Sequence, residues 1–177
     1  MHAIIATSRL ILRELTPKDQ DELARVLSDA DAMRYYPHPF TGEEVEGWIR
    51  WNMENYEKYG YGLWAVIRKA DGVFLGDCGI TMQEIEGREL PELGYHIIPA
   101  YGGRGYATEA AAACVRYAFE HLGMDVLYSY TTPANIPSRR VAEKIGMEAA
   151  ARFRKRIGDH MYEEVLHRIE KRGESPD

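Results

Sequence analysis

The clearest pattern of hydrophobic and polar positions lies between residues 106 and 122. Apolar residues recur there at intervals of three and four, the period of a helix that packs on one side. The stripe consists of Ala107, Ala110, Ala111, Cys114, Val115, Ala118, Phe119 and Leu122. Small side chains fill its first half, so we expect this helix to lie close to a sheet. Gly123 follows, where a left-handed residue commonly ends a helix.

Shorter segments show the alternation or the apolar runs of β-strands. They cover residues 8–15, 62–67, 74–84, 90–98, 126–132, 151–157 and 161–169. The turn signals Asp71-Gly72 and Gly87-Arg88 join the second, third and fourth segments, which predicts an antiparallel meander. A turn at Gly158-Asp159 makes the last two segments a hairpin. The strands before and after the long helix should be parallel, because a helical crossover returns the chain in the same direction.

Three further helices are predicted from capping residues and apolar faces. One begins at Thr16-Pro17, where proline suits the first turn. A second begins at Thr41, and Glu44 completes a capping box. Its inner stripe is expected to be Val45, Trp48, Ile49, Met53 and Tyr56. The last helix begins at Asn135 and ends at Gly146. This order of elements predicts an α+β fold whose mostly antiparallel sheet turns parallel near its centre.

Composition places the chain among globular proteins and excludes several functions. With 177 residues, 45% of them hydrophobic and 28% charged, we expect one domain over residues 1–177. No apolar run reaches the ~20 residues of a membrane helix, and the first residues lack the basic flank of a signal peptide. The expected location is therefore the cytoplasm.

The net charge of −6 argues against a nucleic-acid partner. Cys78 and Cys114 lie in apolar surroundings without zinc-ligand spacing, so we expect buried thiols and no metal.

The candidate chemistry lies just before the long helix, in the segment Tyr101 to Tyr106 (YGGRGY). Its three glycines let backbone N–H groups turn outward at a helix start, where roughly half a positive charge accumulates. Arg104 adds a full charge, so the loop is a candidate cradle for a diphosphate; the alternative is a plain strand–helix connection. A Walker loop is excluded because no Gly-Lys-Ser/Thr follows. The dinucleotide fingerprint is incomplete because Thr108 stands where its third glycine should be.

Five short motifs are spread along the chain. They are Thr7-Ser8-Arg9-Leu10-Ile11-Leu12-Arg13, Gly76-Asp77-Cys78-Gly79, Tyr95-His96-Ile97-Ile98-Pro99, Gly103 to Ala110 (GRGYATEA) and Asn135-Ile136-Pro137-Ser138. Together they resemble the GNAT superfamily of acyl-CoA-dependent N-acyltransferases, and within it the RimJ/RimL-like branch of ribosomal-protein alanine N-acetyltransferases. The likeness covers about residues 7–165 and implies the GNAT fold, with a sheet splayed at a central parallel pair. Gly102 departs from the pattern, since glutamine, arginine or tryptophan is more usual there.

The resemblance implies acetyl-CoA as the acyl donor and assigns the residues that would bind it. The pantetheine arm would bond to the backbone of Tyr95, His96 and Ile97, like an added strand. The diphosphate would lie on Gly103, Arg104, Gly105, Tyr106, Ala107 and Thr108. Asn135 would reach the pantetheine, and Ser138 would lie near the sulfur. Many members of the superfamily place a tyrosine where this chain has Ala142.

Two residues are candidates for the general base that deprotonates an amine. Glu92 resembles the acidic residue that the family places upstream on the same strand, and it would act through water. The alternative reading of Glu92 is a solvated surface residue. His96 titrates in a suitable range, and an amine could also lose its proton to solvent before binding. Cys114 lies on the apolar stripe without a partner histidine, so we expect direct transfer in a ternary complex.

The expected function is therefore acetyl transfer from acetyl-CoA to a primary amine. The branch implies a protein N-terminal amine, and it also implies a homodimer. One alternative is a small acceptor, such as a polyamine, an amino acid or an antibiotic. A closed pocket built from Tyr35, Tyr36, Phe40 and Trp48 would favour this reading, whereas a long acidic groove would favour a peptide. The other alternative is a non-catalytic acyl-CoA-binding module, for which Ala142 is the support.

Overall fold

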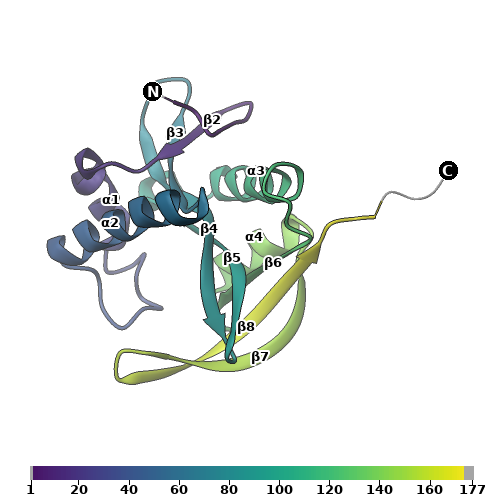
Figure 1. Cartoon of the computed structure of the whole chain (residues 1–177). Coiled ribbons are helices and arrows are strands. Elements are labelled where there is room, and N and C mark those ends of the chain that lie inside the picture. The colour runs from purple at the N-terminus through teal and green to yellow at the C-terminus, as the bar shows by residue number, and fades with distance from the viewer. Residues whose placement is uncertain (1, 174–177) are drawn as a thin grey trace.

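The computed structural model describes residues 2–173, so Met1 and residues 174–177 of the expected single domain lie outside the described part. Residues 2–173 form an eight-stranded sheet in the order β1-β2-β3-β4-β5-β6-β8-β7 (Figure 1). The strands are β1 Ile5–Ala6, β2 Leu10–Glu14, β3 Leu63–Arg68, β4 Phe74–Ile85, β5 Arg88–Ile97, β6 Val126–Thr131, β7 Glu148–Ile157 and β8 His160–Glu170. The helices are α1 Gln20–Leu27, α2 Gly42–Tyr59, α3 Tyr106–Glu120 and α4 Ile136–Lys144.

The strand pairing confirms the predicted α+β topology. Strands β3, β4 and β5 form the expected antiparallel meander, and β7 and β8 form the expected hairpin. Helix α3 is the crossover between β5 and β6, which are parallel. In the part of the chain that the structure describes, Glu92 opposite Tyr128 is the only register pair between these two strands.

Two hydrophobic clusters cover opposite faces of the sheet. Figure 1 shows α1 and α2 on one side and α3 and α4 on the other. The larger cluster joins α3 to the sheet through small side chains, including Ala110, Ala111 and Cys114. As predicted, both cysteines are buried and free; the Sγ atoms of Cys78 and Cys114 are 3.7 Å apart. The second cluster packs α1, α2 and the loop of residues 33–40 against the other face.

Helix starts follow the predicted capping residues, with one difference. Thr41 and Glu44 form the predicted capping box of α2. Thr16 instead begins a short 3-10 turn, Pro17–Asp19, which leads into α1. Asp19 accepts a hydrogen bond from the Thr16 N–H at 2.8 Å and pairs with Arg13 at 2.7 Å, so its carboxylate fixes this turn to β2.

The predicted inner stripe of α2 is wrong at Met53, which is 38% exposed. Asn52 and Asn55 are buried instead. The Asn52 side chain accepts a hydrogen bond from the Leu63 N–H at 2.7 Å and donates one to the Trp48 carbonyl at 3.0 Å. A buried amide is acceptable when it is bonded in this way, so a polar residue takes the inward position.

Gly76 of β4 lies against the backbone of His96 and Ile97 in β5. Its φ is +150°, and a Cβ atom there would lie 1.9 Å from the carbonyl oxygen of His96. Both the dihedral angle and the contact require glycine. The position of Gly76 therefore explains why a glycine begins the motif Gly76-Asp77-Cys78-Gly79.

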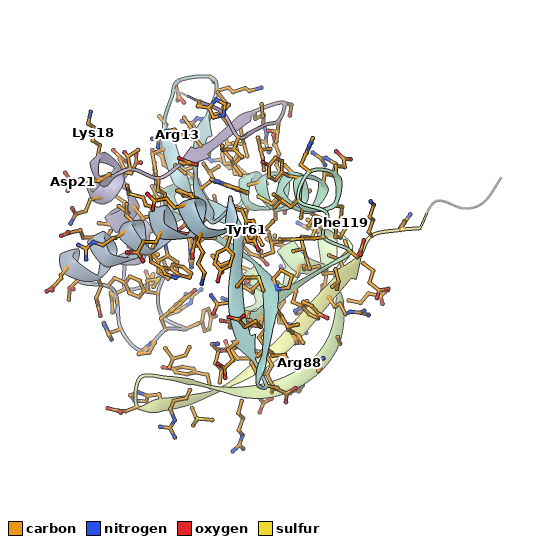
Figure 2. All side chains as sticks on the ribbon, in the orientation of Figure 1. Arg13, Lys18, Asp21, Tyr61, Arg88 and Phe119 are labelled. Atoms are coloured by element: carbon orange, nitrogen blue, oxygen red, sulfur yellow. The ribbon has the colours of Figure 1, made fainter. Side chains whose placement is uncertain are left out.

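The β4–β5 and β7–β8 hairpins extend beyond the helices. Figure 2 shows Arg88 at the tip of the β4–β5 hairpin, far from Phe119 on α3. Phe153 and Leu166 of the second hairpin pack with Ile85 of the first. Lys155 Nζ donates a hydrogen bond to the Glu84 carbonyl at 3.0 Å. These contacts fix the β7–β8 hairpin to the end of β4.

Candidate active site

The site is organised by the separation of β5 from β6 beyond Glu92. The Ile98 N–H bonds back to Leu75 of β4 at 2.8 Å. Because neighbouring residues in a strand point their N–H groups to opposite edges, the N–H groups of Ile97 and Tyr95 face β6. No register pair joins β5 to β6 at these positions in the described residues. The three positions predicted to bind pantetheine, Tyr95 to Ile97, therefore lie on an open strand edge.

The glycine-rich loop leads from this edge into α3. Gly103 and Gly105 have positive φ values of 72° and 79°, and Gly105 is the N-cap of α3. Within the described chain, the N–H groups of residues 103–108 donate no hydrogen bond to another protein group. The loop residues 102–105 are exposed, whereas the Tyr106 ring is buried beneath the Arg9 guanidinium, 4.5 Å away. The cradle is thus a set of backbone donors at a helix start, the arrangement that suits an anion.

Glu109 of α3 holds this loop to the N-terminal segment. Its carboxylate accepts hydrogen bonds from Thr7 Oγ1 at 2.6 Å, Ser8 Oγ at 3.2 Å, the Arg9 N–H at 3.0 Å and Arg9 Nε at 2.6 Å. Arg9 Nη1 also donates to the Arg104 carbonyl at 3.1 Å. Burial alone would raise the pKa of Glu109, but the bonds from Thr7 and Arg9 outweigh it and lower the pKa. The first motif and the loop motif are therefore in direct contact.

Glu92 lies on the face of β5 opposite α3, on the same side as α1 and α2. Burial raises the pKa of its carboxyl to about 7, against the opposing charges of His96 and Lys155. A Cβ atom on Gly94 would lie 3.5 Å from Glu92 Oε2, so the carboxylate extends along the strand towards Gly94. Glu92 is partly buried, and its raised pKa distinguishes it from a solvated surface glutamate.

His96 lies on the same face as Glu92, four residues further along β5. Its Nδ1 is 2.7 Å from Asp77 Oδ1, and its Nε2 is 2.8 Å from the Tyr36 hydroxyl. Trp48 Nε1 donates to the other oxygen of Asp77 at 2.9 Å. Burial alone would lower the pKa of His96, but Tyr36 and Asp77 outweigh it and raise the pKa well above its ordinary value. The histidine side chain is therefore part of a buried polar network, beyond the backbone role predicted for it.

The start of α4 faces the other side of the open edge. Asn135 caps this helix as predicted, since its Oδ1 accepts the Ser138 N–H at 3.2 Å. Tyr95 Oη donates to the Ser138 carbonyl at 2.7 Å, and Ser138 Oγ lies 3.4 Å from Tyr95 Oη. Burial raises the pKa of Tyr95 to about 12. Ala142 is 1% exposed and sits in the apolar cluster under α3.

Sequence reasoning missed the roles of two acidic side chains near this region. Asp77, which stands in one of the five motifs, joins His96 to Trp48. Glu164 of β8 is 3% exposed, and its Oε2 has no hydrogen-bond partner in residues 2–173. Burial raises the pKa of Glu164 to about 7, against the opposing charge of Lys155. A glutamate in an alternating strand gives no sequence signal of burial.

Comparison with known proteins gives the class to which this fold and site belong. The family model described as an acetyltransferase (GNAT) domain matches residues 9–148. The chain belongs to the GNAT acetyltransferase family and is an acetyl-CoA-dependent N-acetyltransferase.

Among the residues that the structure describes, no group of three or more His, Cys, Asp or Glu side chains could hold a metal ion. No helix in residues 2–173 is long and apolar enough to cross a membrane.

Three similar proteins come from species of Bacillus. The uncharacterized protein YkkB of Bacillus subtilis is 39% identical over 152 residues, which are 85% of this chain and 88% of YkkB. The uncharacterized N-acetyltransferase YnaD of the same organism is 32% identical, over 93% of this chain and 95% of YnaD. The crystal structure of a GNAT-family acetyltransferase from Bacillus anthracis has a TM-score of 0.79 and 31% identity, and covers 94% of this chain and 97% of its own.

The RimL structure in complex with coenzyme A has the same fold. This ribosomal L7/L12 alpha-N-protein acetyltransferase has a TM-score of 0.77 and 14% identity, over 96% of this chain and 98% of RimL. This likeness shows that the two proteins share the GNAT fold.

Proposed function

We propose that this protein transfers the acetyl group of acetyl-CoA to a primary amine, by direct attack in a ternary complex. The observation that carries the proposal is the position of Glu92. Its carboxyl, with a pKa of about 7, lies on the face opposite α3 and extends along β5 towards Gly94, the residue before the open stretch Tyr95 to Ile97. A base that titrates near the working pH is the kind that general base catalysis favours.

The residues present fit acetyl-CoA. Six consecutive N–H groups, at residues 103–108, have no partner among residues 2–173 and offer donors to a diphosphate. The free edge at Tyr95, His96 and Ile97 offers backbone groups to the amide-containing pantetheine arm. Arg104 adds charge beside the loop, and Asn135 lies at the start of α4, across the open edge. When bound, acetyl-CoA supplies an activated acyl group.

Three groups of the chain have separate roles in the transfer. Glu92 takes the proton of the attacking amine, through a water molecule, so that the neutral amine is the nucleophile. Ser138 donates a hydrogen bond near the sulfur. The Ile97 N–H, on the open edge, is the natural donor to the carbonyl oxygen as negative charge develops there.

The acceptor belongs to one of two classes. The fold shared with RimL, an alpha-N-protein acetyltransferase, supports a protein N-terminal amine. The aromatic side chains on the Glu92 side support a small amine instead. Tyr36 contacts Phe40 edge-on with ring centroids 6.5 Å apart, and Phe40 contacts Trp48 at 5.7 Å. A compact aromatic wall suits a small acceptor better than an extended peptide.

Thiol release from acetyl-CoA tests this proposal. The assay uses pooled small polyamines, pooled amino acids, and peptides with Ala, Ser or Met N-termini. We expect release that depends on one pool, and loss of most of it in Glu92→Gln. Glu89→Gln is the matched control, because Glu89 is an exposed glutamate of the same strand. Binding of coenzyme A without release from any pool would overturn catalysis and support a binding module.

A further inference from the structure

Two buried polar atoms at the end of β6 have no hydrogen-bond partner in residues 2–173. They are Glu164 Oε2 and Thr132 Oγ1. Thr131 is the register partner of Val165, so the next pair along these antiparallel strands places Thr132 beside Glu164. Glu164 is 3% exposed. A buried acceptor without a donor is rare in folded proteins, because it bears the full cost of desolvation.

The side chains of Glu164 and Glu92 project from the same face of the sheet, in which β6 lies between β5 and β8 (Figure 1). Glu92 is the register partner of Tyr128, and paired residues share a face. Tyr128 packs in one hydrophobic cluster with Phe153, the register partner of Glu164. Both carboxyls therefore lie on the side of α1 and α2, which is the acceptor side of the sheet.

Tyr130 of β6 lies between these two carboxyls. Its N–H donates a hydrogen bond to the Glu92 carboxylate. Its register partner is Leu166, so Glu164 is its diagonal neighbour, with about 7–8 Å between the Cα atoms. Burial raises the pKa of the Tyr130 hydroxyl, and Glu92 and Glu164 are among the charges that raise it further. A short molecule can therefore contact both carboxyls at once.

The charges at this place favour a cationic ligand. Burial raises the pKa of both Glu92 and Glu164 to about 7, and the charge of Glu164 adds to the rise at Glu92. His96 opposes the rise at Glu92, and Lys155 opposes it at both residues. The Lys155 Nζ, however, donates to the Glu84 carbonyl at 3.0 Å and leaves Glu164 Oε2 without a donor. A bound cation would satisfy this oxygen and relieve the repulsion between the carboxyls.

The loop of residues 33–40 spans the gap between β5 and β6 on the same side. The Tyr36 hydroxyl is 2.8 Å from Nε2 of His96 on β5. The hydroxyl of the adjacent Tyr35 donates to the carbonyl of Ala134, after β6, at 3.1 Å. One loop thus contacts both sides of the gap, which favours a compact acceptor over an extended peptide.

We propose that the acceptor is a small molecule with two cationic amines, and that Glu164 is the residue that selects it. This inference rests on the proposed function. One amine loses its proton to Glu92 through water and attacks the acetyl group. The other stays charged and donates hydrogen bonds to Glu164 Oε2 and Thr132 Oγ1; an alkylammonium has three N–H donors, which is enough for both.

The transfer itself is unchanged by this second amine. The nitrogen of the first amine bonds to the acetyl carbon, and the carbon–sulfur bond breaks with its electron pair on sulfur. Coenzyme A leaves as a thiolate, which takes a proton from water, and water takes the amine's proton from Glu92. Aliphatic diamines have the required chemistry. An amino acid such as lysine does not, because its carboxylate would meet two glutamates.

Matched pairs of substrates test the second charge. Each aliphatic diamine, from diaminopropane to diaminohexane, is compared with the amino alcohol of the same length, in which a hydroxyl replaces one amine. We expect kcat/KM of the best diamine to exceed that of its amino alcohol at least about tenfold, the scale of a hydrogen bond to a charged group. Lysine and peptides with Ala, Ser or Met N-termini should be poorer acceptors than this diamine.

Variants of two adjacent glutamates test the residue. Glu164→Gln removes the charge and keeps the size of the side chain. Glu163→Gln is the matched control, because Glu163 pairs with Arg152 and its side chain is 52% exposed. We expect Glu164→Gln to raise the KM for the diamine about 10- to 100-fold, with kcat nearly unchanged and the KM for the amino alcohol within about threefold. Thr132→Val should raise the diamine KM about 3- to 10-fold, and it tests the same site should Glu164→Gln not fold.

A binding measurement tests the site without turnover. Calorimetry follows the binding of the diamine to the complex of the protein with coenzyme A. We expect the Kd to rise at least about tenfold in Glu164→Gln and to be unchanged in Glu163→Gln. Melting curves and coenzyme A binding show that each variant is folded.

The outcomes separate the two proposals. If the wild type acetylates amines but prefers amino alcohols or peptides to every diamine, the second-amine site is wrong and the proposed function stands. Equal diamine KM values in Glu164→Gln and Glu163→Gln would also overturn the role of Glu164. If the folded wild type binds coenzyme A but acetylates no amine, the proposed function falls. Calorimetry then decides the site alone, and no diamine binding, or equal binding by the two variants, would overturn it.

Discussion

Replacing Glu109 by alanine should separate the glycine-rich loop from the N-terminal segment. The carboxylate accepts four hydrogen bonds, two of them from Arg9. A hydrogen bond typically contributes ~1 kcal/mol to stability. Where water can replace the lost partner, we count a loss of roughly half of that for each bond. Side-chain exposures of 45% for Arg9 and 18% for Glu109 call for this discount. We therefore expect a loss of about 2 kcal/mol of stability.

This loss should be visible in thermal melting at pH 7. For a chain of this size, about 2 kcal/mol corresponds to a melting temperature lower by roughly 4–8 °C. Glu46→Ala is the control, because its ion pair with Arg50 is a single contact with side chains 64% and 55% exposed. An exposed pair of this kind contributes less than about 1 kcal/mol. Coenzyme A should also bind more weakly to Glu109→Ala, since the first turn of α3 loses its anchor.

The pH dependence gives an independent check of the same contact. The folded protein lowers the pKa of Glu109, so its contribution is present above the unfolded value of ~4.3 and is lost as pH falls through the folded value. The difference in melting temperature between the wild type and Glu109→Ala should therefore shrink in acid. A Glu109→Ala protein that melts within 1 °C of Glu46→Ala at pH 7, against the roughly 4–8 °C expected, would refute this reasoning.

Two further substitutions test burial and close packing. Because burial raises the pKa of Glu92 to about 7, its stabilising neutral form is lost as pH rises through that value. Glu92→Gln should therefore gain more stability over the wild type at pH 8 than at pH 5; an equal difference at both pH values in urea unfolding would contradict it. Gly76→Ala should lose more than about 4 kcal/mol or fail to fold, because its Cβ would meet the His96 carbonyl at 1.9 Å. Gly47→Ala is its control, since a Cβ there meets no atom within 4 Å, and soluble Gly76→Ala with wild-type melting would show that the strands can separate.

Local patterns predicted the elements of this fold because the relevant information is close in sequence. The capping box of Thr41 and Glu44 and the stripe of α3 depend on residues a few positions apart. The parallel pairing of β5 and β6 follows from the helical crossover between them, which returns the chain in the same direction and needs no side-chain detail. The inward position was assigned to Met53 because polarity alone places Asn52 in solvent. The burial of Asn52 depends on a hydrogen bond from Leu63, which only the folded chain brings near.

The candidate site divides in the same way. The glycine loop and the motif around Asn135 are contiguous, so their residues could be named from sequence. The Asp77–His96–Tyr36 network joins positions up to 60 residues apart, and nothing in the sequence indicates that they meet. The raised pKa of Glu92 likewise results from burial by distant segments. Side-chain chemistry that depends on tertiary contact is therefore the part that sequence reasoning could not reach.

In residues 2–173, one register pair joins β5 to β6, so backbone pairing divides the sheet into two parts. One part carries the N-terminal strands and the β4–β5 hairpin, and the other carries β6, β8 and β7. A ligand that bonds to the open edge of β5 fills the gap and connects the two parts of the sheet. By mass action, a donor at 100 times its Kd would add about 2.7 kcal/mol to the folded state. Amide hydrogens that flank the gap should then exchange more slowly as the donor concentration rises. The acyl donor would therefore contribute to the stability of the enzyme as well as to its reaction.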